Sequence, residues 1–146
     1  MIVIDSSSLI LLAKIGILDK IIMHLKKKLA LTGEVYRECT AKTEAYDASI
    51  IKKRVEEETI LRKEIKNTEL CKKIRQDFNL GRGEAEVIAF CLENRTSLIT
   101  DDKKAIKACK ILRIKFTTAP DLLVRLHNRM VITKTEDGLY FKKLEE

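Results

Sequence analysis

Acidic residues stand along this chain where a catalytic or metal-binding site would need them, at strand ends or in helices that follow strands. Asp5 follows an apolar run at residues 1–4, and Asp101-Asp102 follow a short, centrally apolar stretch at residues 97–100. Sites in open parallel sheets form at the carboxyl ends of strands, so these acids are expected at one rim of a sheet. The full set of candidate catalytic acids is Asp5, Glu38, Glu84, Asp101 and Asp102.

Carboxylates brought together in one pocket repel each other unless a positive charge lies among them. Mg²⁺ or Mn²⁺ would supply that charge, because hard cations prefer oxygen ligands and retain several waters. A carboxylate-held metal with open water positions can activate water and offset charge building on a phosphate, which is the chemistry of phosphodiester hydrolysis. Within this set, Asp5, Glu84 and the pair Asp101 and Asp102 are the candidate metal ligands, and either aspartate of the pair could be the one that binds.

Structural roles compete with these assignments. Asp5 is followed by serines and would serve as a helix N-cap, and one of Asp101 and Asp102 would do the same for the next helix. Glu38 would equally belong to a solvated helix face. Other catalytic motifs are missing, since the chain has no phosphate-binding G-x-x-x-x-G-K-[ST] sequence and Gly81-Arg82-Gly83 lacks the third glycine of a dinucleotide fingerprint.

Composition indicates a basic globular protein. The chain has 146 residues, 45% of them hydrophobic, and a net charge of +7, which predicts one domain, residues 1–146, and a polyanionic partner. Its four cysteines form no C-x-x-C pair, so we expect buried reduced thiols rather than a zinc site or a disulfide framework. No signal peptide or membrane-spanning run is recognised, which predicts a cytoplasmic protein without a membrane partner.

A run of basic residues follows the two aspartates. Lys103, Lys107 and Lys110 recur at helical spacing, opposite an apolar face that contains Ala105 and Ala108. The face either is solvated or holds the phosphates of a nucleic acid beside the acidic site. Around it, short apolar strands alternate with amphipathic helices along the chain, a pattern typical of a three-layer α/β fold with a parallel sheet.

Four short motifs in order carry a family resemblance over residues 1 to about 130. They are Val3-Ile4-Asp5-Ser6-Ser7, Val35-Tyr36-Arg37-Glu38, Gly83-Glu84-Ala85-Glu86 and Leu98-Ile99-Thr100-Asp101-Asp102. With these motifs the chain resembles the PIN domains, the metal-dependent ribonuclease fold of toxins in type II toxin–antitoxin pairs. It is most similar to a prokaryotic, often archaeal, branch that carries G-E-A-E and T-D-D.

The resemblance implies a parallel sheet of order 3-2-1-4-5 and acids that hold Mg²⁺ or Mn²⁺. It also implies cleavage of single-stranded RNA that leaves a 5′-phosphate, with an antitoxin protein and a second copy of the chain as further partners. Asp5 would be the first acid, Glu38 the second, Glu84 the third and Asp101-Asp102 the fourth. The third acid is Glu where most of the family has Asp, and Glu86 competes with it.

Two alternatives to the ribonuclease remain at this point, because a fold does not settle a function. One is an RNA-binding or protein-binding module with a residual acidic cluster. The other is a subunit of an RNA-processing assembly, docked through the polar helix expected at residues 42–58.

Overall fold

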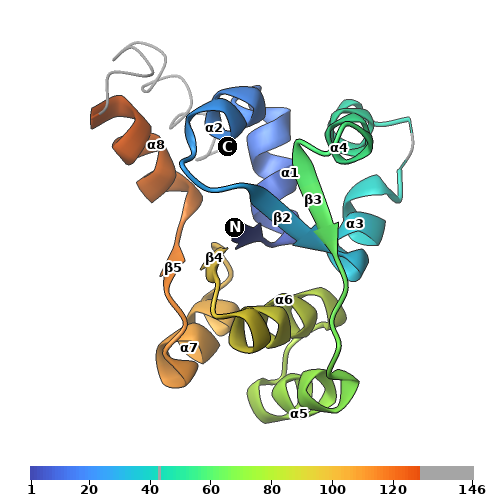
Figure 1. Cartoon of the computed structure of the whole chain (residues 1–146), viewed down its shortest axis with the longest axis vertical. Coiled ribbons are helices and arrows are strands. Elements are labelled where there is room, and N and C mark those ends of the chain that lie inside the picture. Colours follow the sequence, from blue (N-terminus) through green and yellow to red (C-terminus); the bar gives the residue numbers. More distant parts are fainter. Residues whose placement is uncertain (43, 129–146) are drawn as a thin grey trace.

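A parallel sheet of five strands separates two layers of helices in the computed structural model, which describes residues 1–42 and 44–128 (Figure 1). The strand order is β3-β2-β1-β4-β5, which confirms the order and the three-layer α/β fold expected from the resemblance. The strands are β1 (Ile2–Ile4), β2 (Leu29–Thr32), β3 (Ile60–Lys63), β4 (Ser97–Ile99) and β5 (Phe116–Thr117).

The central strands are apolar because helices cover both faces of the sheet. Val3 pairs with Ala30 on one side and with Leu98 on the other, and all three side chains are buried. Backbone pairing continues beyond the end of β1, where the Asp5 N–H donates to the carbonyl of Ile99 at 3.1 Å. The first candidate acid is therefore anchored by the sheet itself.

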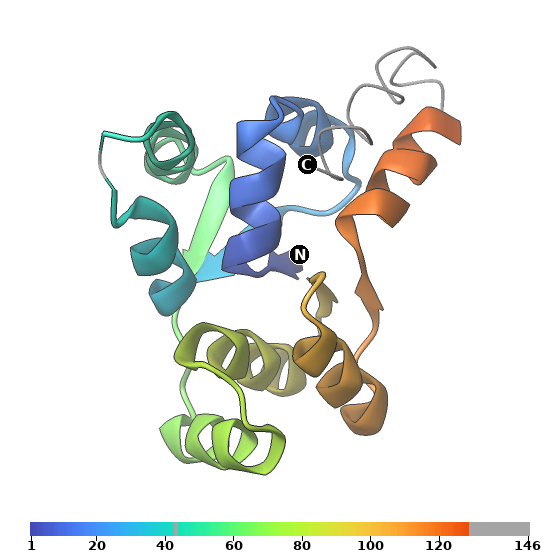
Figure 2. The same cartoon turned by 180° about the vertical axis from the view of Figure 1, so that it is seen from behind.

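Helices α1 to α4 and α8 lie on one side of the sheet, and α5, α6 and α7 lie on the other (Figures 1 and 2). Their bounds are α1 (Ser6–Lys14), α2 (Leu18–His24), α3 (Gly33–Thr40), α4 (Tyr46–Glu56), α5 (Thr68–Phe78), α6 (Arg82–Asn94), α7 (Lys103–Leu112) and α8 (Ala119–Asn128). None of these described helices is long and apolar enough to cross a membrane. The C-terminal part of the chain, from residue 129, lies outside the described residues.

Several helix starts are those that the sequence predicts. Asp5 caps α1 by accepting from the Ser8 N–H at 3.0 Å, and Asn67 caps α5 through the Leu70 N–H at 3.0 Å. Thr118 accepts from the Asp121 N–H at the start of α8. Thr32, the residue before α3, makes no side-chain capping bond, and its hydroxyl is buried without a partner among the described residues.

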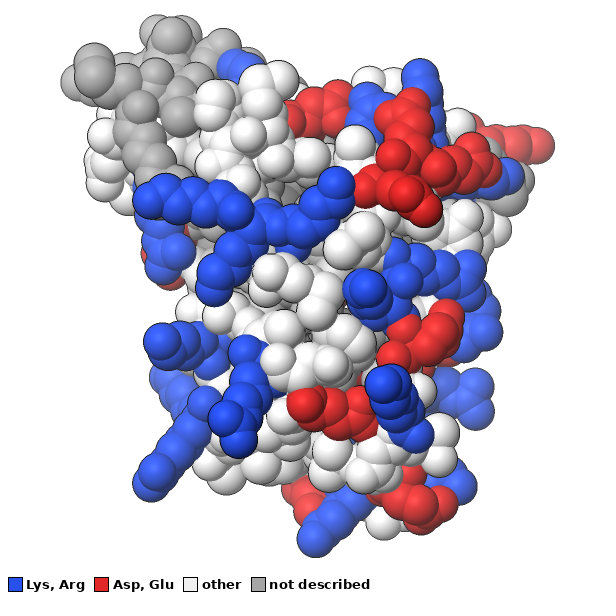
Figure 3. All heavy atoms as spheres, in the orientation of Figure 1, with Lys and Arg blue, Asp and Glu red and all other residues white. Residues whose placement is uncertain are grey.

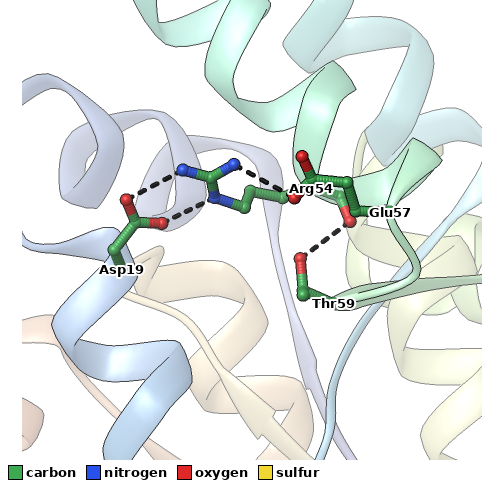
Figure 4. A network of polar contacts seen from close by, with 4 residues as sticks. All are labelled: Asp19, Arg54, Glu57 and Thr59. Carbon is green, nitrogen blue, oxygen red and sulfur yellow. Dashed lines mark hydrogen bonds and ion pairs between the residues drawn. The ribbon is translucent and has the colours of Figure 1, made fainter.

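The expected polar helix over residues 42–58 is shorter, and it is tied to the rest of its layer by an ion pair. Arg54 of α4 donates to both carboxylate oxygens of Asp19 on α2, at 2.7 and 2.9 Å, and to Glu57 at 3.3 Å (Figure 4). The Thr59 hydroxyl donates to the Arg54 carbonyl at 2.9 Å. This bidentate contact links two helices that are separated in sequence by β2 and α3.

The Asp19 contact makes stability depend on pH. The hydrogen bond from Arg54 lowers the pKa of Asp19, so its stabilisation is present above the unfolded-state pKa and is lost as pH falls through the folded-state pKa. Asp19→Asn should lower the melting temperature at neutral pH. The loss in unfolding free energy should be no more than about 1 kcal/mol, because Asp19 is largely solvated. Glu56→Gln, on α4 but outside the ion pair, is the control for thermal melts across pH. A pH-independent difference between Asp19→Asn and wild type would contradict the assignment.

Candidate active site

The candidate acids gather at the carboxyl edge of the sheet. Asp5 follows β1 and Asp101-Asp102 follow β4, and these two strands are neighbours whose last residues, Ile4 and Ile99, lie in register. Helices α1, α3, α6 and α7 meet around this edge, since α3 contacts α1 and α6, and α6 contacts α7 (Figure 2). Residues far apart in the sequence are thus brought to one region.

Asp5 is the most buried of these acids, with 3% of its surface exposed. One carboxylate oxygen accepts from the Ser8 N–H, and the other accepts from the Thr100 hydroxyl. Burial raises the pKa of Asp5, and the nearby charge of Asp101 raises it further, while the hydrogen bonds from Thr100 and Ser8 oppose the rise. The side chain is therefore held in one position by its neighbours on α1 and after β4.

Asp101 and Asp102 have different surroundings. Asp101 accepts from the Ser8 hydroxyl at 2.9 Å and from the Ala119 N–H at 3.2 Å. Asp102 accepts from the Ala105 N–H at 2.8 Å and is the N-cap of α7. The prediction that one of the pair is a cap is confirmed, and Ser8 joins the other, Asp101, to Asp5.

The carboxylates of Glu38, on α3, and Glu84, on α6, both lie at the start of α6, where two glycines make room for them. The Glu38 carboxylate accepts from the Ser6 hydroxyl at 2.9 Å and lies against Gly83, in space that a side chain there would fill. The Glu84 carboxylate lies against Gly81 in the same way. Burial raises the pKa of Glu38, and the charges of Glu84, Glu34 and Asp5 add to the rise.

Glu86 belongs to a different contact. Its carboxylate accepts from the Glu34 N–H at 3.0 Å, and so satisfies the first turn of α3 where Thr32 does not. Of the two candidates for the third acid, Glu84 is the one beside the other site acids, because it lines the same surface depression as Asp101 and Asp102.

That depression has a volume of about 500 Å³ and a mixed charge. Lys103 and Lys104 line it together with Glu84 and the two aspartates. Lys107 and Lys110, the other predicted RNA-binding lysines, are exposed further along α7 and do not line the depression.

Lys104 was not among the predicted RNA-binding residues, because the prediction selected lysines at helical spacing from Lys103 and Lys104 does not have that spacing. Of the supporting hydroxyls, those of Ser6 and Thr100 belong to the motifs that carry the family resemblance, whereas Ser8 carried no signal in the sequence.

The acids lie at one edge of the sheet, as the sequence predicts, but not in the arrangement of a formed metal site. Among the described residues, no group of three or more His, Cys, Asp or Glu side chains is arranged to hold a metal ion. The acids instead form two halves, with Asp5 and Asp101 joined through Ser8, and Glu38 and Glu84 at the start of α6. The donor set still fits a hard cation, since it offers carboxylate oxygens alone. Burial, with a further contribution from like charges, raises the pKa values of Asp5 and Glu38.

The four cysteines belong to no group of side chains that could hold a metal ion in the described part of the chain. All four are free, and burial raises the pKa of Cys39 and Cys109 to about 12 and that of Cys91 to about 11. Thiols with such pKa values stay protonated at neutral pH, whereas metal ligation requires the thiolate.

A family model described as PIN domain matches residues 1–141 of the sequence. The chain belongs to the PIN domain family. PIN domains are generally nucleases that use divalent metal ions, so this PIN domain has a nuclease fold. The crystal structure of PAE2754 from Pyrobaculum aerophilum shares the fold with a TM-score of 0.63 and 20% sequence identity, over 87% of this chain and 89% of that one. None of the curated proteins matches the sequence.

The capping role of Asp102 can be tested by comparing the stabilities of two Asp102 variants. Asp102→Ala removes the cap of α7 and should cost about 1 kcal/mol of unfolding free energy, whereas Asp102→Asn should cost only a few tenths because Asn is an equally good cap. Denaturant titrations of the two variants measure the difference. Equal losses in both would show that the carboxylate charge, and not capping, is what Asp102 contributes.

Proposed function

We propose that this PIN domain is a metal-dependent endoribonuclease that hydrolyses phosphodiester bonds of single-stranded RNA at the carboxyl edge of its sheet. The observation that carries the proposal is the coupling of Asp5 and Asp101, which come from adjacent strands and share Ser8 as a hydrogen-bond donor. Together with Glu38 and Glu84 they form an acidic cluster next to an open depression rimmed by lysines.

Each residue has a role in this proposal. Asp5, Glu84 and Asp101 would hold Mg²⁺ or Mn²⁺, with Asp102 beside them. When bound, such an ion lowers the pKa of a coordinated water and offsets the charge that builds on the phosphate. Thr100 and Ser8 keep Asp5 oriented, Ser6 orients Glu38, and Ser8 also orients Asp101. The basic residues beside Asp102 would hold the phosphates of the RNA.

We further propose that the protein acts as the toxin of a toxin–antitoxin pair, binding an antitoxin protein and pairing with a second copy of itself. This part rests on the similarity to toxin-type PIN domains. An adjacent reading frame for a small antitoxin whose product suppresses the cleavage would support it.

One observation favours a second candidate function, a PIN-fold module that binds RNA or protein without cutting. The acids lie in two halves rather than in a preformed metal site among the described residues. A module of this kind would bind RNA with or without a divalent cation and would leave the RNA intact.

The deciding experiment compares wild type with Asp5→Asn. Wild type should cut single-stranded RNA with Mn²⁺ and stop when EDTA is added, and Asp5→Asn should fall to background. Mn²⁺ at about 100 times its dissociation constant should stabilise wild type by about 2.7 kcal/mol, because it binds only the folded state. Asp5→Asn should lose this gain in a thermal melt.

Asp77→Asn is the matched control, since Asp77 is exposed on α5 and lies outside the acidic cluster. It should keep both cleavage and the response to Mn²⁺. If wild type neither cuts nor gains stability with Mn²⁺, or if Asp5→Asn gains as much, the non-cutting module replaces the nuclease.

The lysines of α7 make a separate prediction about the substrate. Lys103, Lys107 and Lys110 are exposed on one face of α7, opposite the buried Ala105 and Ala108. Changing all three to Gln should flatten the log–log salt dependence of RNA binding by about two units, at about 0.7 per phosphate contact. The melting temperature and the response to Mn²⁺ should not change. An unaltered salt slope in fluorescence anisotropy would leave this face without a role in binding.

A further inference from the structure

A groove with basic walls lies at the amino edge of the sheet, away from the acidic cluster. Two adjoining pockets of about 500 and 310 Å³ share Lys27, Ser97, Ile114 and Lys115. Ser97 begins β4, and Ile114-Lys115 lead directly into β5. Because the strands are parallel, this amino-edge groove and the acids after β1 and β4 occupy opposite edges of the sheet.

No acidic residue in the described part of the chain lines the amino-edge groove. Six cationic residues do: Lys26, Lys27, Arg95, Arg113, Lys115 and Arg125. None of the six forms an ion pair with an acid in the described part of the chain. In Figure 3, which shares the orientation of Figure 1, Lys and Arg side chains gather along the left of the molecule, whereas acids gather at the upper right. The groove therefore carries an unbalanced positive charge.

Helix stabilisation accounts for only part of this charge. Arg95 and Arg113 stand at the C-caps of α6 and α7, where the helix dipole favours cations. Both adopt left-handed backbone angles, φ 52° and 59°, at positions where glycine is the ordinary residue. The same effect favours Lys26 and Lys27, which follow the C-cap of α2, and Arg125 in the last turn of α8. Lys115, which leads into β5, lies outside the helices.

The lining between the cations is apolar. Ile2, Leu25, Ile114, Phe116, Leu122 and Leu126 line the larger pocket. Single-stranded nucleic acid offers both partners that such a groove needs, since its phosphates pair with cations and its unpaired bases contact apolar and aromatic surface. A duplex keeps its bases stacked inside, and a small anion leaves the apolar lining uncovered.

We propose that the amino-edge groove is a second binding site for single-stranded RNA, separate from the acidic edge. The choice of RNA among polyanions rests on the proposed ribonuclease function, whereas the preference for a polyanion rests on the groove itself. A strand held there is anchored without metal and without the catalytic acids. Such an anchor would keep one part of an RNA bound while another part reaches the opposite edge.

The test measures binding of a fluorescent single-stranded RNA to the full chain across a salt series, in EDTA so that no cleavage occurs. A groove variant changes Lys27, Lys115 and Arg125 to Gln. A matched control changes Lys52, Lys66 and Lys73, three exposed lysines outside the groove, to Gln. Both variants lose three positive charges. A difference between their RNA affinities therefore depends on where those charges lie and not on the net charge.

The groove variant should bind RNA about tenfold more weakly at low salt and with a slope flatter by about two units, while the control stays within about twofold of wild type. Thermal melts establish that both variants fold. Equal affinity and slope in the two variants would overturn the proposal. So would displacement of the RNA by poly-glutamate as effectively as by unlabelled RNA at matched charge, because the site would then take any polyanion.

The same assay separates this inference from the nuclease proposal. Asp5→Asn should bind RNA in EDTA with the wild-type slope, since Asp5 lies on the opposite edge. A protein that binds through the groove but never cuts would refute the nuclease and keep the groove. If the wild-type protein cuts RNA with Mn²⁺ but the groove variant binds RNA as wild type does, the groove proposal is refuted and the nuclease proposal is kept.

Discussion

The burial of one carboxylate governs the arrangement of the whole carboxyl edge. A carboxylate removed from water is costly unless hydrogen bonds compensate it, and Asp5 is 3% exposed at the end of the central strand. Its compensation comes from Ser8 on α1 and from Thr100 after β4. These contacts require β1 and β4 to be neighbours and α1 to begin at once. The pairing of β1 with β4 and the position of the site thus depend on the same few bonds.

Helix polarity helps to explain why acids collect there. In a βα unit the helix begins at the carboxyl edge, so the positive ends of the α1, α6 and α7 dipoles all point toward the acidic cluster. Partial positive charge from three helix starts lowers the cost of assembling like charges, although the pKa values of Asp5 and Glu38 remain raised. The opposite edge receives helix ends, and there cations collect. The charge asymmetry of the domain follows in part from the direction in which its strands run.

The sequence predicted the elements better than it predicted the contacts between them. Apolar runs located β1 and β4, and cap chemistry located the starts of α1, α5 and α7, because both signals are local. The strand order came from the family resemblance. Periodicity could not foresee that Glu86 would satisfy α3 in place of Thr32, or that Ser6 and Ser8 would each hold a distant acid. Those contacts span 32 to 93 residues and depend on how helices pack.

At Gly83, the stability of α6 and the placement of Glu38 oppose each other. The glycine lies in the first turn of α6, where alanine would be a better helix former by up to about 1 kcal/mol. The carboxylate of Glu38 occupies the space that the alanine methyl group would need. Selection for a stronger helix alone would replace the glycine and displace the acid, leaving the fold intact. Under the proposed function, a side chain at this position in a related sequence would predict a second acid that has moved from its place beside α6.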